Sequence, residues 1–361
     1  MGRYLRTIYG NRKEKLRQKI VMMYLFLLLF NFAVWFWAFY SLYNFPLLFG
    51  SAVMAYSFGL RHAVDADHIA AIDNVTRKLL QEGKQPIGVG FFFSLGHSSV
   101  VIIATIIIAL STQAIMQANF DKWHQIGSII CTSCSAIFLL LMAVINILIF
   151  FSIYKTFTQI RNGKKFTEQD ANELMGQNGF LVKRFRRFMN LISHSWQMFP
   201  LGFLFGIGFD TATEVGLLGL SATQASEGVS MWTILLFPAL FTAGMTLIDT
   251  SDGIFMLSAY GWAFLKPVRK LYYNLTITLA SALVALLVGG IEALNLIAGK
   301  TGWRGSFWNF INQINDRFNS LGFFIILFFI LSWVVSIFIY KWMNFAALDE
   351  RFVDDKQRNS F

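Results

Sequence analysis

Residues 59–74 read GLRHAVDADHIAAIDN, which places one arginine, three aspartates and two histidines within sixteen positions. The rest of the chain is strongly apolar: hydrophobic residues make up 56% of the 361 residues, charged residues only 14%, and the mean hydropathy is +0.55. A water-soluble domain leaves much of its surface exposed, so it could not cover this much apolar surface. The composition indicates an integral membrane protein, in which a buried ionisable side chain needs a partner or a function.

Eight segments are long and apolar enough to cross a bilayer as helices, because about twenty apolar residues span its hydrocarbon core. They lie at 20–41, 46–76, 86–111, 126–154, 197–221, 231–263, 271–298 and 321–345. Their continuous apolar runs favour helices over the alternating strands of a membrane barrel. We therefore predict an all-α integral membrane protein with eight transmembrane helices and a single transmembrane domain over 1–361.

Lysine and arginine residues cluster at alternate ends of these spans. Seven precede Ile20, three lie in 77–85, eight in 155–195, three in 264–270, and four follow from residue 341 onward. Connections on the cytoplasmic side of a membrane carry an excess of basic residues. The pattern predicts that both termini are cytoplasmic, and it explains the net charge of +10 without a nucleic-acid partner.

The connection 155–195 is the one long polar insertion, and two interpretations of it stay open. The part around 180–192 combines apolar and basic residues as an amphipathic helix on the membrane surface would, while a flexible linker is equally compatible. The segment 300–320 is also amphipathic, and we expect it on the external surface. Cys131 and Cys134 form a CxxC pattern within an apolar span, where packing explains them better than a redox or zinc role.

The histidines of the opening stretch share a helix face with an aspartate if 46–76 is one continuous helix. At about 100° per residue, His62 and His68 lie about 60° to either side of Asp65. Asp67 then points towards a neighbouring side. The spacing predicts a compact group of imidazoles and carboxylate within the membrane.

Imidazole and carboxylate together are the ligands of a borderline divalent cation such as nickel, cobalt or zinc. Magnesium prefers oxygen ligands alone, and copper(I) prefers sulfur. Arg61, one turn before Asp65, can offset part of the acidic charge. A helix–helix hydrogen bond is the usual role of a lone membrane histidine, but two histidines and two aspartates within seven residues indicate a metal site.

Further polar residues interrupt three other apolar spans. They are His97, Ser98 and Ser99 in 86–111; Asp210, Thr211, Thr213 and Glu214 in 197–221; and Asp249, Thr250, Ser251 and Asp252 in 231–263. Polar groups on four helices converge at least cost on one internal cavity. Asn146 and Glu292 stand alone in their spans, so we expect packing or capping roles for them, and His124 and His194 lie in connections.

Two motifs recur at nearly the same interval. FGLRHAVDAD at 58–67 matches the spacing of FGIGFDTATE at 205–214, an offset of 147, and SLGHSS at 94–99 matches TAGMTL at 242–247, an offset of 148. The repeat predicts that helices 1–3 and 4–6 are copies of opposite topology, an arrangement common in alternating-access carriers. Neighbouring glycines would permit close helix approach or local unwinding: Gly59, Gly96, Gly206, Gly208, Gly244 and Gly253.

These motifs resemble those of the nickel/cobalt permease family known as NiCoT, and the resemblance covers nearly the whole chain. The signature RHAxDADHI stands at 61–69 and LGHSSVV at 95–101. LGFDTATE stands at 207–214, with Ile207 in place of leucine, and GMxLIDTxDG stands at 244–253. The resemblance implies an eight-helix plan with cytoplasmic termini and high-affinity uptake of Ni²⁺, often with Co²⁺, across the cytoplasmic membrane. It also implies a metal-handling core of His62, Asp65, Asp67 and His68, with a contribution from His97.

We expect Ni²⁺ to shed much of its water in a cavity between the second, third, fifth and sixth spans, where neutral imidazoles bind it. The other polar residues of these spans, Arg61 included, would line the path or orient the ligands. The metal is then the transported substrate, and no cofactor is expected. Protonation of imidazole predicts weaker uptake at acid pH. Uniport driven by membrane potential and proton-coupled transport both fit the sequence.

Rival functions are a membrane-embedded metalloenzyme, a metal sensor, and a carrier for another divalent cation such as Zn²⁺ or for an organic cation. An enzyme of the multi-histidine type needs more histidines than the five present, and the HExxH motif of zinc proteases is absent. A sensor would need a soluble signalling domain. An organic-cation carrier has no use for HAVDADH. The sequence therefore favours a nickel or cobalt transporter.

Overall fold

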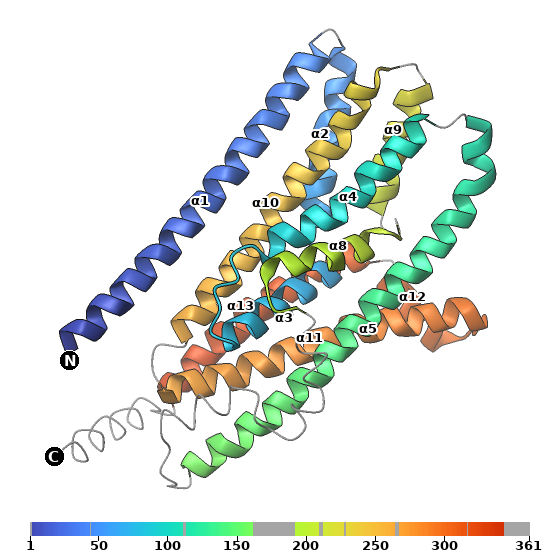
Figure 1. Ribbon diagram of the computed structural model, residues 1–361. Coiled ribbons are helices and arrows are strands. Elements are labelled where there is room, and N and C mark those ends of the chain that lie inside the picture. The colour runs from blue at the N-terminus through green and yellow to red at the C-terminus, as the bar shows by residue number, and fades with distance from the viewer. Residues whose placement is uncertain are drawn as a thin grey trace, which may run out of the picture.

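The computed structural model describes residues 2–43, 45–110, 113–161, 192–208, 212–226, 229–263, 267–315 and 317–342. Within these residues the fold is entirely helical, with no strand, which confirms the predicted fold class (Figure 1). In the part of the chain that the structure describes, six helices contain a stretch long and apolar enough to cross a membrane. They are α1 (Gly2–Leu42), α4 (Val89–Leu110), α5 (Gln113–Arg161), α10 (Met231–Ala263), α11 (Pro267–Thr301) and α13 (Phe318–Trp342).

The remaining elements are short, and four of them come from two of the predicted spans. The prediction of one continuous helix over 46–76 is wrong, because this segment forms α2 (Pro46–His62) and α3 (Ala66–Gln81). The segment 197–221 is likewise divided into α8 (Met198–Gly206) and α9 (Ala212–Ser226). The other short elements are η1 (Ser195–Gln197) and α12 (Ser306–Asn315).

The first break follows His62 directly. The amides of Val64 and Asp65 donate to carbonyls three residues earlier, at 3.1 and 2.9 Å, which tightens the last turn of α2. Asp65 then takes extended backbone angles, and α3 begins at Ala66. Gly322 of α13 supports the break from outside, since a Cβ at this position would collide with the carbonyl oxygen of Val64. The backbone of α13 therefore packs directly against the break.

Helix α2 lies against α10 through two glycines, one from each helix. A Cβ at Gly59 would collide with the carbonyl of Phe241, and a Cβ at Gly244 would lie 2.8 Å from the carbonyl oxygen of Tyr56. Only glycine permits backbones to approach this closely. The predicted close approach at these two glycines is confirmed.

Helix α8 lies against α4 in the same way. A Cβ at Gly202 would collide with the carbonyl of Phe93, and one at Gly96 would collide with the carbonyl of Phe199. In both cases, then, the first half of a broken helix packs on a long continuous helix through a reciprocal pair of glycines. Figure 1 shows α2 beside α10 and α8 beside α4.

Helix α3 is the most enclosed part of the fold and packs against α4, α5, α10, α11 and α13. Every residue from Ala66 to Leu79 is buried except Asp67. The expectation that Arg77 and Lys78 lie in a connection is therefore wrong, since both are buried in α3. Lys78 donates to the carbonyl of Ile192 at 2.6 Å.

Other sequence-based predictions concern the periphery. The possible surface helix around 180–192 lies outside the described residues except for Ile192, which is buried. In the 300–320 segment, α12 forms a short helix whose side chains are mostly exposed. Cys131 and Cys134 are free thiols. Cys131 donates to the carbonyl of Phe205 at 2.8 Å, which agrees with a packing role.

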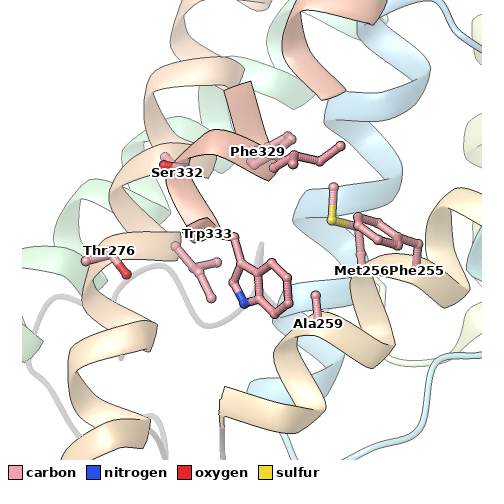
Figure 2. Close-up of a pocket in the computed structure, with 10 residues that line it drawn as sticks. Phe255, Met256, Ala259, Thr276, Phe329, Ser332 and Trp333 are labelled. Carbon is pink, nitrogen blue, oxygen red and sulfur yellow. The ribbon is translucent and has the colours of Figure 1, made fainter. Parts of the chain in front are cut away.

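An apolar recess lies between α10, α11 and α13, apart from the polar centre of the fold. Figure 2 shows Met256 of α10, Thr276 of α11, and Phe329 and Trp333 of α13 around it. Its lining includes no acidic residue and no histidine. Such a recess is unsuited to binding a metal ion, because it offers neither carboxylate nor imidazole ligands.

Candidate functional site

Three histidines meet at the first helix break. His62 is the last residue of α2, His68 lies in the first turn of α3, and His97 lies in the middle of α4. Their ring centroids are separated by 4.7 to 4.9 Å, and one nitrogen from each ring lies within 4.8 Å of the other two. Within the described ranges, the three rings therefore form a group compact enough to hold a metal ion. The structure places the three predicted histidines side by side, and a turn rather than a continuous helix face brings His62 and His68 together.

His62 is held by oxygen atoms on one side and faces His97 on the other. Its Nδ1 lies 2.9 Å from Asp65 Oδ2 and 3.2 Å from Thr213 Oγ1. Its Nε2 lies 2.9 Å from Nε2 of His97. A carboxylate on the far nitrogen of a histidine fixes the ring orientation and raises its basicity as a metal ligand. Asp65 is thus placed to orient His62.

Glu214 of α9 reaches into the same group. Its Oε1 lies 2.8 Å from Nε2 of His97 and 3.9 Å from Nε2 of His62, and the residue is 1% exposed. The sequence analysis placed Glu214 along the path rather than among the ligands. In the structure, this carboxylate is near enough to the ring nitrogens of His97 and His62 to bind the same ion as they do.

His68 has its own acidic neighbour. Its Nδ1 lies 3.4 Å from Asp249 Oδ2 on α10, and its Nε2 has no hydrogen-bond partner among the residues described. Ser94 of α4 donates to the same Asp249 oxygen at 2.6 Å. Ser94 was not among the predicted residues, although its position three residues before His97 places it on the same face of α4.

Two phenylalanines form apolar walls beside the rings. Phe93 meets His68 edge-on at a centroid distance of 4.8 Å, and Phe241 lies 5.5 Å from His62. Both phenylalanines are fully buried. They exclude water from the histidine cluster, so charges there interact more strongly than they would in bulk solvent.

Two predicted site residues, Asp67 and Arg61, make no hydrogen bond or ion pair to the three rings within the described residues. Asp67 accepts the backbone N–H of His68 at 2.9 Å and is partly exposed. Arg61 is exposed, so the expectation that it offsets charge inside the site is not supported. Asp65 remains the acid of this stretch that contacts an imidazole.

The remaining predicted residues fall into three groups. Ser98 and Ser99 donate to Met245 Sδ at 3.6 Å and to the carbonyl of Gly96 at 2.6 Å. On α10, Thr250 is buried, Ser251 donates to the carbonyl of Leu247 at 2.7 Å, and Asp252 is half-buried. Asp210 and Thr211 lie outside the described residues. Within the described part of the chain, the side chains of the first two groups make no hydrogen bond to the three rings.

A second polar layer lies further along α3 and was not expected. Asn146 of α5 donates to Asn74 at 2.5 Å and accepts a hydrogen bond from the buried Arg77. The expectation that Asn146 is isolated is therefore wrong. Glu292 also has a partner, since it accepts from Ser135 of α5 at 2.9 Å. Asn74 and Arg77 are three positions apart and so share one helix face, and this spacing could have indicated a polar layer on α3.

Comparison with known protein families places this arrangement among metal carriers. The family model described as "High-affinity nickel-transport protein" matches residues 48–339. This range begins near the start of α2 and ends within α13, so it includes every residue of the histidine cluster. No solved structure matches the chain significantly.

Individual relatives carry the same designation or a closely related one. The chain is 52% identical to a "High-affinity nickel transport protein" of Cupriavidus necator over 341 residues, 94% of this chain and 97% of that one. It is 47% identical to the "Hydrogenase nickel incorporation protein HupN" of Bradyrhizobium diazoefficiens, over 86% of this chain and 81% of the relative. It is 38% identical to the "Cobalt transport protein NhlF" of Rhodococcus rhodochrous, over 78% of this chain and 80% of the relative.

Proposed function

The chain belongs to the high-affinity nickel-transport protein family, and from this premise we propose that Ni²⁺ crosses the membrane through the cluster of His62, His68 and His97. The protein is a multi-pass membrane transporter rather than an enzyme, and the metal is its substrate rather than a cofactor. The single observation that carries the proposed route is the convergence of three buried imidazoles. Imidazole nitrogen suits a borderline cation such as Ni²⁺ better than it suits Mg²⁺.

The proposed ligand set combines three rings with one carboxylate. Glu214 supplies the oxygen ligand, because it lies within 2.8 Å of His97 and 3.9 Å of His62. Asp65 and Asp249 lie behind His62 and His68 and orient their rings. Asp67 contributes negative charge at the start of α3. The negative charge of these acids offsets the positive charge of a dication that has shed its water.

The two helix breaks support an inverted repeat. In the repeat alignment of the sequence, α2 corresponds to α8, α3 to α9 and α4 to α10. The first half-helix of each unit packs on the long third helix of the other unit, α2 on α10 and α8 on α4. Phe93 and Phe241, which line the cluster, are also 148 positions apart. We propose that the two units rock about this shared site to give alternating access, as in other carriers with broken helices at mid-membrane.

The same proposal gives the topology. The broken pairs α2–α3 and α8–α9 each count as one crossing, which with the six long helices makes eight within one transport domain. Both termini then lie in the cytoplasm, and the membrane is the cytoplasmic one. An inside-negative potential favours cation uptake by about 2.3 kcal/mol per charge per 100 mV, so a dication gains about twice that. Co²⁺ is the second substrate we propose, since a relative is named as a cobalt transporter.

Uptake of radioactive Ni²⁺ into cells that express the chain tests this proposal. The double variant His62→Ala, His68→Ala should lose saturable uptake at unchanged expression. His194→Ala is the matched control, because this histidine is exposed and outside the cluster. Co²⁺, the ion named for one relative, should compete with Ni²⁺, and Mg²⁺ should not compete because it prefers oxygen ligands alone. Uptake by the double variant at the rate of the control would contradict the proposed route.

A further inference from the structure

Ser94 of α4 is linked to the histidine cluster through a carboxylate. Its hydroxyl donates to Asp249 Oδ2 on α10 at 2.6 Å, and the same carboxylate oxygen lies 3.4 Å from Nδ1 of His68. Ser94, Asp249 and His68 have no exposed surface. Ser94 therefore reaches the imidazole of His68 through one shared oxygen atom.

The position of the Asp249 side chain depends on this bond. Within the described residues, the hydrogen bond from Ser94 is the one that the carboxylate accepts, because its second oxygen, Oδ1, has no hydrogen-bond partner there. The distance of 3.4 Å to His68 is longer than the 2.9 Å between Asp65 Oδ2 and His62 Nδ1. Asp249 is therefore held beside His68 by the serine rather than by the ring itself.

The Ser94 hydroxyl has one proton to donate and two acceptors within reach. The other acceptor is the carbonyl of Gly90, one turn earlier in α4, at 2.9 Å. A hydroxyl that donates to a charged carboxylate lies at about 2.5–2.7 Å from it, and the 2.6 Å to Asp249 falls in this range. The carboxylate is therefore the acceptor that takes the proton.

The backbones of α4 and α10 bring Ser94 and Asp249 together. A Cβ at Gly90 would lie 1.9 Å from the carbonyl oxygen of Asp249, so the two helices approach here as closely as only glycine permits. Phe93, which precedes Ser94, meets the ring of His68 edge-on at a centroid distance of 4.8 Å. Two consecutive residues of α4 thus act on His68, one through its ring face and one through its acid.

The corresponding residue in the second copy of the repeated motif has a purely local bond. Thr242 stands 148 positions after Ser94. Its hydroxyl donates to the carbonyl of Pro238, four residues earlier, at 2.7 Å, which is the usual bond of a serine or threonine inside a helix. Ser94 has the equivalent carbonyl within reach but also bonds to an acid of another helix. This additional bond distinguishes Ser94 from a serine that only fills a helix.

We propose that Ser94 is a positioning residue for metal binding, which holds Asp249 beside Nδ1 of His68 and so leaves Nε2 of this ring to Ni²⁺. The inference rests on the proposed route through the histidines and deepens it. A carboxylate beside Nδ1 favours the ring form that carries its proton on that nitrogen. Nε2 then keeps its lone pair for the metal, and it has no hydrogen-bond partner among the described residues.

The Ni²⁺ affinity of the purified full-length protein, measured by isothermal titration calorimetry, tests this role. Ser94→Ala should weaken Ni²⁺ binding by about tenfold, the lower end of what loss of an outer partner costs at a metal site. Ser221→Ala is the matched control, because Ser221 also has no exposed surface and donates to the carbonyl of Leu217, in its own helix, at 3.0 Å. The control should bind Ni²⁺ as the unaltered chain does.

The same substitution in two further backgrounds separates positioning from a merely structural role. Once His68→Ala or Asp249→Ala has removed a group through which Ser94 acts, Ser94→Ala should change the Ni²⁺ affinity by less than about twofold, because effects within one network are not additive. Either background serves if the other variant does not fold.

Two results would overturn the proposal: an equal loss of affinity in every background, or no loss when Ser94→Ala is introduced alone. Neither result affects the histidine route. That route fails instead if the double variant His62→Ala, His68→Ala takes up Ni²⁺ at the rate of its control, whatever Ser94→Ala does.

Discussion

The two helix breaks share a backbone plan but differ in chemistry. The break between α2 and α3 carries His62, Asp65 and His68, whereas the break between α8 and α9 is followed by Thr213 and Glu214. One break therefore contributes nitrogen atoms, and the other contributes oxygen atoms to the same cluster. Both breaks pack on a long helix through paired glycines, while their polar side chains differ. Under the proposed inverted repeat, the shared packing would serve movement and the different side chains would serve metal recognition.

Removal of a nitrogen ligand should have the largest effect. We expect His97→Ala to lower the initial rate of Ni²⁺ uptake at least about 100-fold, the upper end of what the loss of an outer-shell partner causes at a metal site. His97 faces both His62 and Glu214, so its loss opens both sides of the cluster. Uptake of radioactive Ni²⁺ at matched expression gives the measurement. An uptake rate within a few-fold of wild type would contradict the proposed role of His97 as a metal ligand.

The oxygen side should come next. Glu214→Gln keeps the shape of the side chain and removes its charge, so we expect a loss of about 10- to 100-fold in uptake. Glu292→Gln provides the comparison, because Glu292 is also buried but its partner is Ser135 on α5. The ratio of the two effects separates a ligand role from the general cost of altering a buried acid. Equal effects would show that Glu214 has only a structural role.

The packing symmetry can be broken separately in each half. Gly59→Ala and Gly202→Ala place a methyl group against the carbonyls of Phe241 and Phe93. Overpacking of this kind costs about 1–3 kcal/mol of stability, so both variants should unfold at lower temperature in detergent. Gly290→Ala is the control, since no atom lies within 4 Å of its Cβ position. A large effect in one half and none in the other would argue against equivalent packing.

Composition and motif spacing were enough to predict the helical fold class, the histidines and their convergence. They could not predict the break after His62, because residues 63–65 contain neither glycine nor proline. The residue that packs against the break, Gly322, lies on α13, far away in the sequence. Arguments from helix periodicity assume a continuous helix, so they cannot reveal a turn between two helices that pack at a distance from each other in the sequence.

Long-range partners were the other limit of prediction. Glu214 and His97 are 117 positions apart, and Asn146 and Asn74 are 72 apart. Nothing local in the chain indicates which side chains meet across such distances. The sequence could therefore indicate that polar groups gather inside the membrane, but only the packing of α4 on α9 and of α3 on α5 assigns their partners.

The smallest effect should come from the neutral hydrogen bond between the two breaks. Thr213 Oγ1 lies 3.2 Å from His62 Nδ1, the atom that Asp65 already holds at 2.9 Å. Thr213→Val keeps the shape and removes the hydroxyl, and we expect uptake to fall by less than about tenfold, because a neutral hydrogen bond contributes only about 0.5–1.5 kcal/mol. Asp65→Asn, measured in parallel, should lower uptake more, because it removes the charge that orients the ring. If Thr213→Val were the more harmful change, the hydroxyl of the second break would be the group that positions His62, and the division into a nitrogen-bearing half and a supporting half would have to be redrawn.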